Sequence, residues 1–390
     1  MSSYHSERQT LAQLPRPAAG EIAHSNRLVE FLIAEIEQRG GIISFRDYMQ
    51  FVLYQPGLGY YSAGLSKFGA GGDFVTAPEI SALFGSTLAR QCELIFEQGA
   101  ARNILEFGAG SGRLCQQILT RLNQSCTYSI IELSADLRLR QQEYLQSCLP
   151  GEVFQRVRWL DQLPVEFSGV VLGNEVLDAM PVHLVSKDQQ WFELGVVFDG
   201  TRFNWCRLTD DSEAVSAISH IEATRGLLPA GYTTEVNLNF RPWLNALREC
   251  CEQAVILMID YGYEQADYYR PERCSGTLIC HYHHRSHADP LVYPGLQDIS
   301  ASVDFDAFAD AAIDCDFEIC GYTTQGQFLL AGGLLEEAER PLADKDTKSR
   351  LGFSQQIKTL TMPTEMGERF KVIGIHRNLD IDIPALTAGR

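Results

Sequence analysis

The feature that most constrains the fold of this chain is a turn with three glycines at alternating positions, placed directly after a short apolar stretch. Residues 103–105 are patterned as a β-strand that Glu106 closes, and residues 113–122 are patterned as a helix. The glycines between them are Gly108, Gly110 and Gly112. Because glycine has no Cβ, such a turn brings bare backbone close to a ligand. The order of strand, turn and helix predicts a doubly wound α/β domain that binds a nucleoside ligand.

The spacing of these glycines favours S-adenosylmethionine over a dinucleotide. The dinucleotide fingerprint has its third glycine three places after the second, and Arg113 occupies that place. The next predicted strand, 127–131, ends at Glu132, where a carboxylate about 20 residues past the glycines can accept both ribose hydroxyl protons. We expect Glu106 to face the amino-acid end of the ligand. A glycine-rich turn can also be a plain strand-to-helix loop, and the two acids favour the cofactor instead.

Length and charge narrow the class of protein further. A chain of 390 residues with 45% hydrophobic residues exceeds one average domain, so we expect a catalytic core with an added lobe or insertions. The formal net charge of −18 and the pI of 4.9 argue against a nucleic-acid partner, because phosphates select a basic surface. An acidic surface suits a small or cationic partner, and it also serves solubility.

Cysteine usage and hydropathy predict an intracellular protein. The eleven cysteines include no CxxC pair, which suits a reducing compartment. No apolar run reaches the roughly 18 residues that a membrane helix needs, and the first ten residues are polar. We expect a disordered tail over 1–20, no membrane segment, and a bacterial cytoplasm rather than a mitochondrial matrix. A homodimer is compatible with the sequence.

Residues 21–100 are predicted to form an N-terminal helical lobe with a cofactor lid. Apolar residues at helical spacing and a predicted N-cap at Ser44 define its helices. The glycine-rich segment 57–81 is too aromatic for a flexible linker. We interpret it as a loop that wraps a ligand, with an ordinary surface loop as the alternative. The predicted helices lie at 25–39, 45–53 and 78–96.

The rest of the chain alternates strands and helices, which predicts a parallel sheet with ligands at the carboxyl ends of its strands. Residues 101–182 are predicted as the first part of the core and 183–250 as an insertion with antiparallel β-hairpins. Residues 251–390 are expected to complete the core, with a long irregular substrate loop over 263–302. The further predicted strands are 157–160, 169–172, 254–259, 317–320, 328–331 and 370–375, and the further predicted helices are 243–250 and 348–360.

A polar loop follows the predicted strand 169–172 and carries Asn174, Glu175 and Asp178. In a doubly wound fold this loop lies beside the reactive end of the cofactor. The acids could hold a cationic guanidinium or ammonium group and help to remove its proton. The alternative is that Asp178 caps a helix while Glu175 is solvated.

A cluster of sulfur and imidazole side chains lies within the long irregular segment. Its members are Cys274, Cys280, His281, His283, His284 and His287. The spacing matches no closed zinc site, so we predict no metal there. A loop that lines the substrate entrance is the interpretation that we favour.

Several blocks of the chain resemble the MidA family of S-adenosylmethionine-dependent methyltransferases, which includes the mitochondrial complex I assembly-factor arginine methyltransferases. The resemblance extends over residues 43–375. Proline is common in the family at position 109 and serine at position 77, and this chain has alanine at both. The blocks are GDFVTAPEIS at 72–81, the glycine turn with Glu106, NEVLDAMPV at 174–182, IDYG at 259–262, PG at 294–295, DI at 298–299, VDF at 303–305, TQGQFL at 324–329 and MGERFKV at 366–372.

The resemblance implies a class I methyltransferase core, a Rossmann-like doubly wound sheet, with an N-terminal helical lobe and a substrate-side insertion. It also implies a protein substrate, because the mitochondrial relatives are associated with symmetric dimethylation of arginine in a complex I subunit. We predict catalysis by Asn174, Glu175 and Asp178. The predicted cofactor-binding residues are Gly72, Asp73, Phe74, Thr76, Glu106, Gly108, Gly110, Gly112, Glu132 and Asp161.

Three functions stay open at this point. The first is methyl transfer to a protein, at arginine, and the second is methyl transfer to a small molecule. The third is a non-catalytic assembly factor that retains the cofactor fold as a docking surface. The acidic loop and the long insertions, which could form a groove, favour the first function. A closed pocket under the glycine-rich lid would favour the second.

Overall fold

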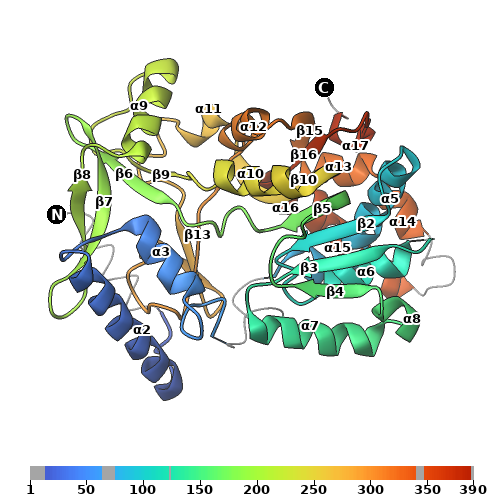
Figure 1. Cartoon of the computed structure of the whole chain (residues 1–390), viewed down its shortest axis with the longest axis horizontal. Helices are drawn as coiled ribbons and strands as arrows, with labels where there is room; N and C mark the ends of the chain where they lie inside the picture. Colours follow the sequence, from blue (N-terminus) through green and yellow to red (C-terminus); the bar gives the residue numbers. More distant parts are fainter. Residues whose placement is uncertain (1–13, 64–74, 123, 340–346, 388–390) are drawn as a thin grey trace. The chain divides into compact units, whose positions relative to one another are not determined.

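The computed structural model describes residues 14–63, 75–122, 124–339 and 347–387, with the side chains of 347–351 left out (Figure 1). The chain divides into two compact units, and each draws on several stretches of sequence. The first unit takes the chain up to Phe74 together with Ala179–Asn239 and Glu264–Ser302. The second unit takes Val75–Asp178, Phe240–Tyr263 and the chain from Val303 onward.

The second unit is built on a largely parallel sheet whose strand order is β15-β16-β10-β5-β2-β3-β4. The five strands from β10 to β4 run parallel, while β16 is antiparallel to both of its neighbours. The apolar run at 254–259 is buried within β10, as a central strand with helices on both faces requires. The doubly wound class I methyltransferase fold predicted from the sequence is therefore confirmed. The strands are β2 (Asn103–Phe107), β3 (Thr127–Ile131), β4 (Val157–Leu160), β5 (Phe167–Asn174), β10 (Cys251–Tyr263), β14 (Val303–Asp304, beside β10), β15 (Glu318–Thr324) and β16 (Phe370–Arg377).

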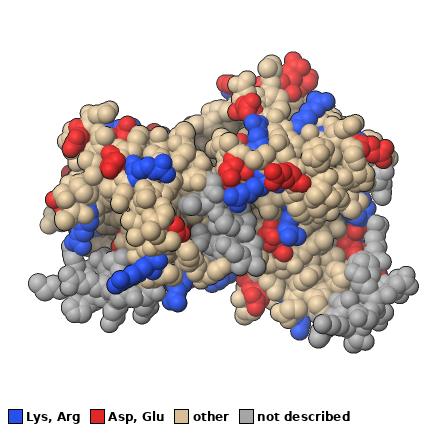
Figure 2. All heavy atoms as spheres, turned by 90° about the horizontal axis from the view of Figure 1, so that it is seen from below, with Lys and Arg blue, Asp and Glu red and all other residues tan. Residues whose placement is uncertain are grey.

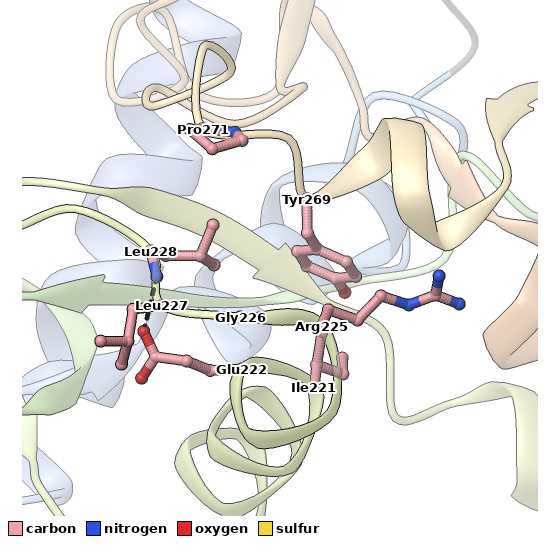
Figure 3. Close-up of a pocket in the computed structure, with 8 residues that line it drawn as sticks. All are labelled: Ile221, Glu222, Arg225, Gly226, Leu227, Leu228, Tyr269 and Pro271. Atoms are coloured by element: carbon pink, nitrogen blue, oxygen red, sulfur yellow. Dashed lines mark hydrogen bonds between the residues drawn. The ribbon is translucent and has the colours of Figure 1, made fainter.

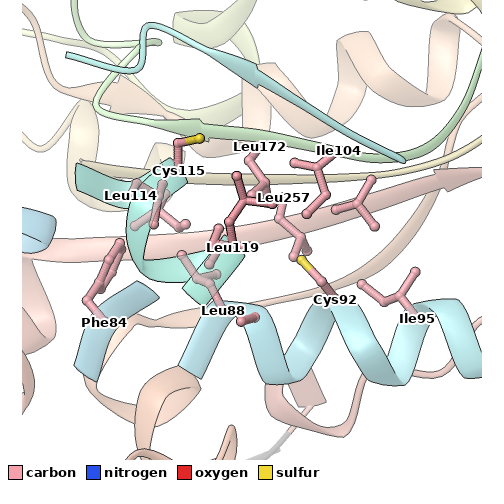
Figure 4. Close-up of a cluster of buried hydrophobic side chains, with 14 of the residues drawn as sticks. Phe84, Leu88, Cys92, Ile95, Ile104, Leu114, Cys115, Leu119, Leu172 and Leu257 are labelled. Atoms are coloured by element: carbon pink, nitrogen blue, oxygen red, sulfur yellow. The ribbon is translucent and has the colours of Figure 1, made fainter. Parts of the chain in front are cut away.

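Helices cover both faces of this sheet. On one face, Leu88 and Cys92 of α5 point toward Ile104, Leu172 and Leu257 on the strands, as Figure 4 shows. On the other face, the ring of Phe107 meets Trp243 of α10 edge-on, with the ring centroids 5.3 Å apart. The helices of this unit are α4 (Ala77–Ile80), α5 (Ala82–Glu97), α6 (Arg113–Arg121), α7 (Ala135–Cys148), α8 (Gly151–Phe154), α10 (Phe240–Cys250), α12 (Phe305–Asp314), α13 (Gln325–Ala331), α14 (Leu334–Glu339), α15 (Thr347–Thr361), α16 (Met366–Arg369) and α17 (Pro384–Thr387).

Two predictions for this unit were wrong. The helix predicted over 78–96 is two helices, because Ser81 is extended and its hydroxyl accepts a 3.2 Å hydrogen bond from Leu83 N, which caps α5. The strand predicted over 328–331 is the end of α13, whose N-cap Thr324 accepts a bond from Gln327 N. A four-residue apolar run cannot by itself distinguish a strand from a buried helix segment.

The first unit contains a five-stranded antiparallel sheet in the order β1-β7-β6-β9, with β8 beside β7. Its apolar core joins this sheet to α2 and α3, and Ser44 caps α3 as predicted by accepting a 3.0 Å bond from Asp47 N. The antiparallel strands expected after residue 183 are confirmed. The elements are α2 (Ala19–Gln38), β1 (Ile43–Ser44), α3 (Phe45–Tyr54), β6 (His183–Lys187), β7 (Trp191–Phe198), β8 (Phe203–Thr209), α9 (Glu213–Arg225), β9 (Thr233–Val236) and α11 (Gln265–Tyr268).

The segment 263–302 is more regular than predicted. It contains a three-stranded antiparallel sheet in the order β12-β11-β13. The turn between the first two strands uses His283 and His284 with φ of +47° and +60°, which is the geometry of a two-residue hairpin turn. No glycine or asparagine marks this turn, so its residue types did not predict a hairpin. The strands are β11 (Ile279–Tyr282), β12 (Arg285–His287) and β13 (Asp298–Ser300).

Among the described helices, none combines the length and the apolar character needed to span a bilayer. Figure 2 shows acidic and basic side chains interspersed over the face drawn there, so the net charge of −18 does not gather into one acidic patch on that face.

Candidate active site

The glycine turn lies at the carboxyl end of β2, where ligands bind in sheets of this kind. Gly108, Gly110 and Gly112 have φ of +61°, +53° and +81°, a region that residues with a Cβ rarely adopt. Gly112 is the N-cap of α6 in this left-handed conformation. The turn therefore needs its glycines for its shape, and it presents backbone at the edge of the sheet.

Glu132 follows β3 at the same edge and is held by two hydrogen bonds. Its Oε1 accepts from Ser134 N at 2.9 Å, and its Oε2 accepts from Nε2 of Gln141 at 3.0 Å. The same Gln141 amide donates to the carbonyl of Gly110 at 3.0 Å, so one buried side chain joins the acid to the glycine turn. A carboxylate can accept several protons at once, so a carboxylate beside the glycine turn is chemically suited to ribose hydroxyls.

Glu106 is the most buried acid of the predicted set, with an exposed fraction of 2%. Tyr128 donates a 2.9 Å hydrogen bond to its Oε2. Burial raises the pKa of Glu106 to about 8, the hydrogen bond from Tyr128 opposes the shift, and the charge of Glu132 adds to it. Because Glu106 is buried, its contact with the amino-acid end of a ligand stays a prediction.

Glu79 of α4 contacts the glycine turn, although the sequence did not single it out. Its Oε1 accepts a hydrogen bond from the hydroxyl of Ser111, and its Oε2 lies 2.7 Å from Nε of Arg113 at the start of α6. The carboxylate is nearly buried, with 9% of the side chain exposed. The signal in the sequence was its place in the block 72–81, which we interpreted as a lid without assigning the acid a role.

Of the remaining predicted cofactor residues, three lie outside the described residues and two are described. Gly72, Asp73 and Phe74 lie outside the described residues, whereas Thr76 is described as the N-cap of α4. Asp161 follows β4 and is exposed, and its Oδ1 lies 2.5 Å from Nη1 of Arg138. Its position at the carboxyl edge of the sheet is compatible with ligand contact, which stays a prediction.

The predicted catalytic residues lie on the loop after β5. The amide of Asn174 donates to Oε1 of Glu175 at 3.0 Å, and Glu175 has a φ of +56°, an unusual value for a residue with a side chain. A Cβ added to Gly108 would lie 3.3 Å from Cγ2 of Val176. The acidic loop and the glycine turn are therefore side by side. The helix-cap alternative for Asp178 is wrong, because the described residues after it form a turn and then β6.

Asp260, near the end of β10, organises this loop. Its Oδ2 accepts hydrogen bonds from the backbone N–H groups of Val176, Leu177 and Asp178 at 3.1, 2.8 and 3.2 Å. Burial raises the pKa of Asp260 well above its usual range, and the charges of Asp178 and Glu175 add to the rise. The signal in the sequence for this role is an acid directly after the fully apolar run at 254–259.

The cysteine and histidine cluster is dispersed: Cys274 precedes β11, and the other members lie on β11, on β12 and in the turn between them. Cys280 is buried, and His287 is buried with its Nδ1 accepting from Asp289 N at 3.3 Å. Across the described part of the chain, no three His, Cys, Asp or Glu side chains are grouped so that they could hold a metal ion.

A small pocket of about 120 Å³ lies in the first unit (Figure 3). It opens beside the end of α9, where Glu222 accepts a 2.8 Å bond from Leu228 N. Its lining residues are Ile221, Glu222, Arg225, Gly226, Leu227, Leu228, Tyr269 and Pro271. None of them belongs to the glycine turn or to the acidic loop.

The sheet order, the glycine turn and the acids at the carboxyl edge define a class I methyltransferase. A family model described as "Putative S-adenosyl-L-methionine-dependent methyltransferase" matches residues 87–323. The chain belongs to this family, and the resemblance predicted from its sequence is confirmed. S-adenosylmethionine is thus the cofactor of its family.

Solved structures and curated relatives agree with this assignment. The chain is 41% identical to a Burkholderia thailandensis protein crystallised with S-adenosyl-homocysteine, at a TM-score of 0.87 over 96% of this chain and 97% of that one. It is 28% identical to the mitochondrial protein arginine methyltransferase NDUFAF7 of Danio rerio, over 86% of this chain and 83% of the relative. The Drosophila melanogaster homologue is 27% identical over 92% of this chain and 87% of the relative.

Proposed function

We propose that this methyltransferase acts on a protein and that the acceptor is an arginine side chain. The observation that carries the proposal is the contact between the glycine turn at Gly108 and the loop of Glu175 and Asp178. A cofactor site thereby adjoins two carboxylates, which suit a cationic acceptor. The names of the mitochondrial relatives support arginine as that acceptor.

The residues at the sheet edge fit S-adenosylmethionine. The glycine turn offers backbone at positive φ, and the Glu132 carboxylate is joined to it through Gln141. Gln141 ties the acid and the turn together, so the site is organised by a buried side chain. When bound, the cofactor supplies an electrophilic methyl group on a sulfonium sulfur.

The acids of the neighbouring loop have two tasks in this proposal. Arginine arrives charged, because its pKa is above about 12, so the guanidinium must be oriented before a nitrogen can attack the methyl carbon. Glu175 and Asp178 hold the cation and accept the proton that the nitrogen loses. Asn174 fixes the Glu175 carboxylate through its 3.0 Å hydrogen bond.

The test is to incubate the protein with cofactor labelled in the methyl group and with lysate of the host cell. Label in a protein band that yields methylated arginine on hydrolysis is the expected result. Label only in small molecules would instead support a small-molecule methyltransferase. Cofactor binding without any transfer would support the non-catalytic assembly factor.

The matched variants are Glu175→Gln, which should lose transfer, and Glu252→Gln, which should keep it. Glu252 is exposed at the start of β10 in the same unit, so its variant removes one negative charge away from the loop.

A further inference from the structure

Glu175 has a backbone conformation that needs an explanation. Its φ of +56° lies in the left-handed region, where a residue with a long side chain is uncommon. Such a conformation persists only when the surrounding structure enforces it, and it is often found at functional sites. The contacts that hold this loop therefore indicate which residues matter for its shape.

Two sets of hydrogen bonds to β10 enforce the conformation, one to a backbone carbonyl and one to a side-chain carboxylate. The N–H of Glu175 donates to the carbonyl of Ile259 at 2.9 Å, which continues the pairing of β5 with β10. The next three N–H groups of the loop then converge on Oδ2 of Asp260 at 2.8 to 3.2 Å. Oδ2 of Asp260 thus accepts the N–H groups of residues 176–178 at the point where the chain leaves β5.

Asp260 is well suited to this task by its own surroundings. It is completely buried, and its second oxygen accepts a 2.9 Å bond from Tyr261 N. Both of its oxygens accept from backbone donors, and these hydrogen bonds favour the deprotonated carboxylate, in opposition to the burial and the neighbouring charges that raise the pKa of Asp260. An asparagine in its place would present an N–H₂ group to one of those donors.

We propose that Asp260 is a positioning residue that fixes the left-handed turn at Glu175 and so aims its carboxylate at the acceptor. The catalytic role of Asp260 rests on the proposed function. Its effect on the backbone conformation of Glu175 rests on the hydrogen bonds alone. Asp260 acts through the backbone of the loop.

The test compares Asp260→Asn and Asp260→Ala with the wild type by two readouts. The first is hydrogen exchange at the amides of residues 176–178, which should speed up by about tenfold or more in Asp260→Ala and less in Asp260→Asn, which keeps one acceptor. The second is the rate of label transfer at saturating cofactor, which should fall by about 10² because a small misplacement of a catalytic group costs that much. Cofactor affinity should stay unchanged.

The control is Asp304→Asn. Asp304 is another buried aspartate of the same unit, and its Oδ1 accepts a 3.0 Å bond from Ala307 N at the start of α12. Asp304→Asn should cost little stability, because asparagine caps a helix nearly as well as aspartate, and it should leave both readouts unchanged. Should Asp260→Ala fail to fold, Asp260→Asn decides.

Unchanged exchange at residues 176–178, or full transfer by a folded Asp260 variant, would overturn the inference. If the wild type itself transfers no label, the proposed function fails. The exchange measurement then still decides whether Asp260 holds the loop.

Discussion

The hydroxyl of Tyr128 donates a 2.9 Å hydrogen bond to Oε2 of Glu106, and this pair lies buried under the glycine turn. The hydroxyl is the donor because Tyr128 is itself buried with a raised pKa. Tyr128 of β3 and Glu132 after β3 act on the Glu106 carboxyl, which itself raises the pKa of the buried Cys115 thiol on α6. None of them is a cation, so burial dominates and favours the protonated acid.

This relationship predicts a pH-dependent stability. Burial raises the pKa of Glu106 from 4.5 to about 8, so between these values the folded chain holds a proton that the unfolded chain releases. The stabilisation is fully present below pH 4.5 and is lost as the pH rises toward 8, by at most about 1.4 kcal/mol per pH unit. Glu106→Gln, which cannot ionise, should remove this part of the decline when denaturant unfolding is measured from pH 5 to 8.5.

Tyr128→Phe provides the comparison variant. The hydrogen bond from Tyr128 lowers the pKa of Glu106, so its loss should extend the decline in stability to higher pH. If the free energy of unfolding declines equally with pH in the wild type and in Glu106→Gln, then Glu106 does not titrate in this range.

Glu132 is expected to carry a large part of the cofactor affinity. Removing a charged acceptor from two ribose hydroxyls costs roughly 2 kcal/mol, which is at least a tenfold weaker affinity. Calorimetry on Glu132→Ala should show that loss. Glu143→Ala is the control, because Glu143 is exposed on α7 and its removal changes the charge by the same amount. Equal affinity of Glu132→Ala and the wild type would place the ribose elsewhere.

The local elements of this site were predictable from the sequence, because each depends on neighbouring residues. The glycines fix the turn, the β-branched and aromatic residues at 127–131 favour β3, and Ser44 caps α3 through Asp47, three residues away. The doubly wound sheet follows from the order of such elements.

The contacts that hold the site were not predictable, because they join residues far apart in the chain. Asp260 reaches Val176 across 84 positions through the register of β5 against β10, and Glu79 reaches Ser111 across 32. Glycine spacing and apolar periodicity carry no information about such partners. The hairpin turn at His283 was missed for a different reason, since its residues are not those that favour positive φ.

Glu175 and Asp178 are expected to act on the acceptor and to leave the cofactor site intact. Glu175→Gln should keep cofactor affinity and lower turnover by roughly 10² or more, the usual scale for a positioned acid or base. Asp178→Asn should lower turnover in the same direction, because the residues directly after Asp178 form a turn and β6, so no helix begins there for an asparagine to cap. Paired measurements of affinity and turnover test both variants. Full activity in Glu175→Gln would exclude that acid from catalysis, and lost affinity in either variant would move the residue to the cofactor site.

Glu79 is expected to support cofactor binding through the glycine turn. Glu79→Gln keeps the shape of the side chain and breaks the 2.7 Å ion pair with Arg113, which leaves a cation beside a cationic cofactor. The pair is partly exposed on the arginine side, so we expect a loss of about 1 kcal/mol, or about fivefold in the dissociation constant. Asp136→Asn is the control, because it breaks the 2.9 Å pair with Arg140 on α7 and should not alter affinity. Calorimetry on the two folded variants checks this, and an unchanged dissociation constant in Glu79→Gln would show that the glycine turn keeps its binding shape without the acid.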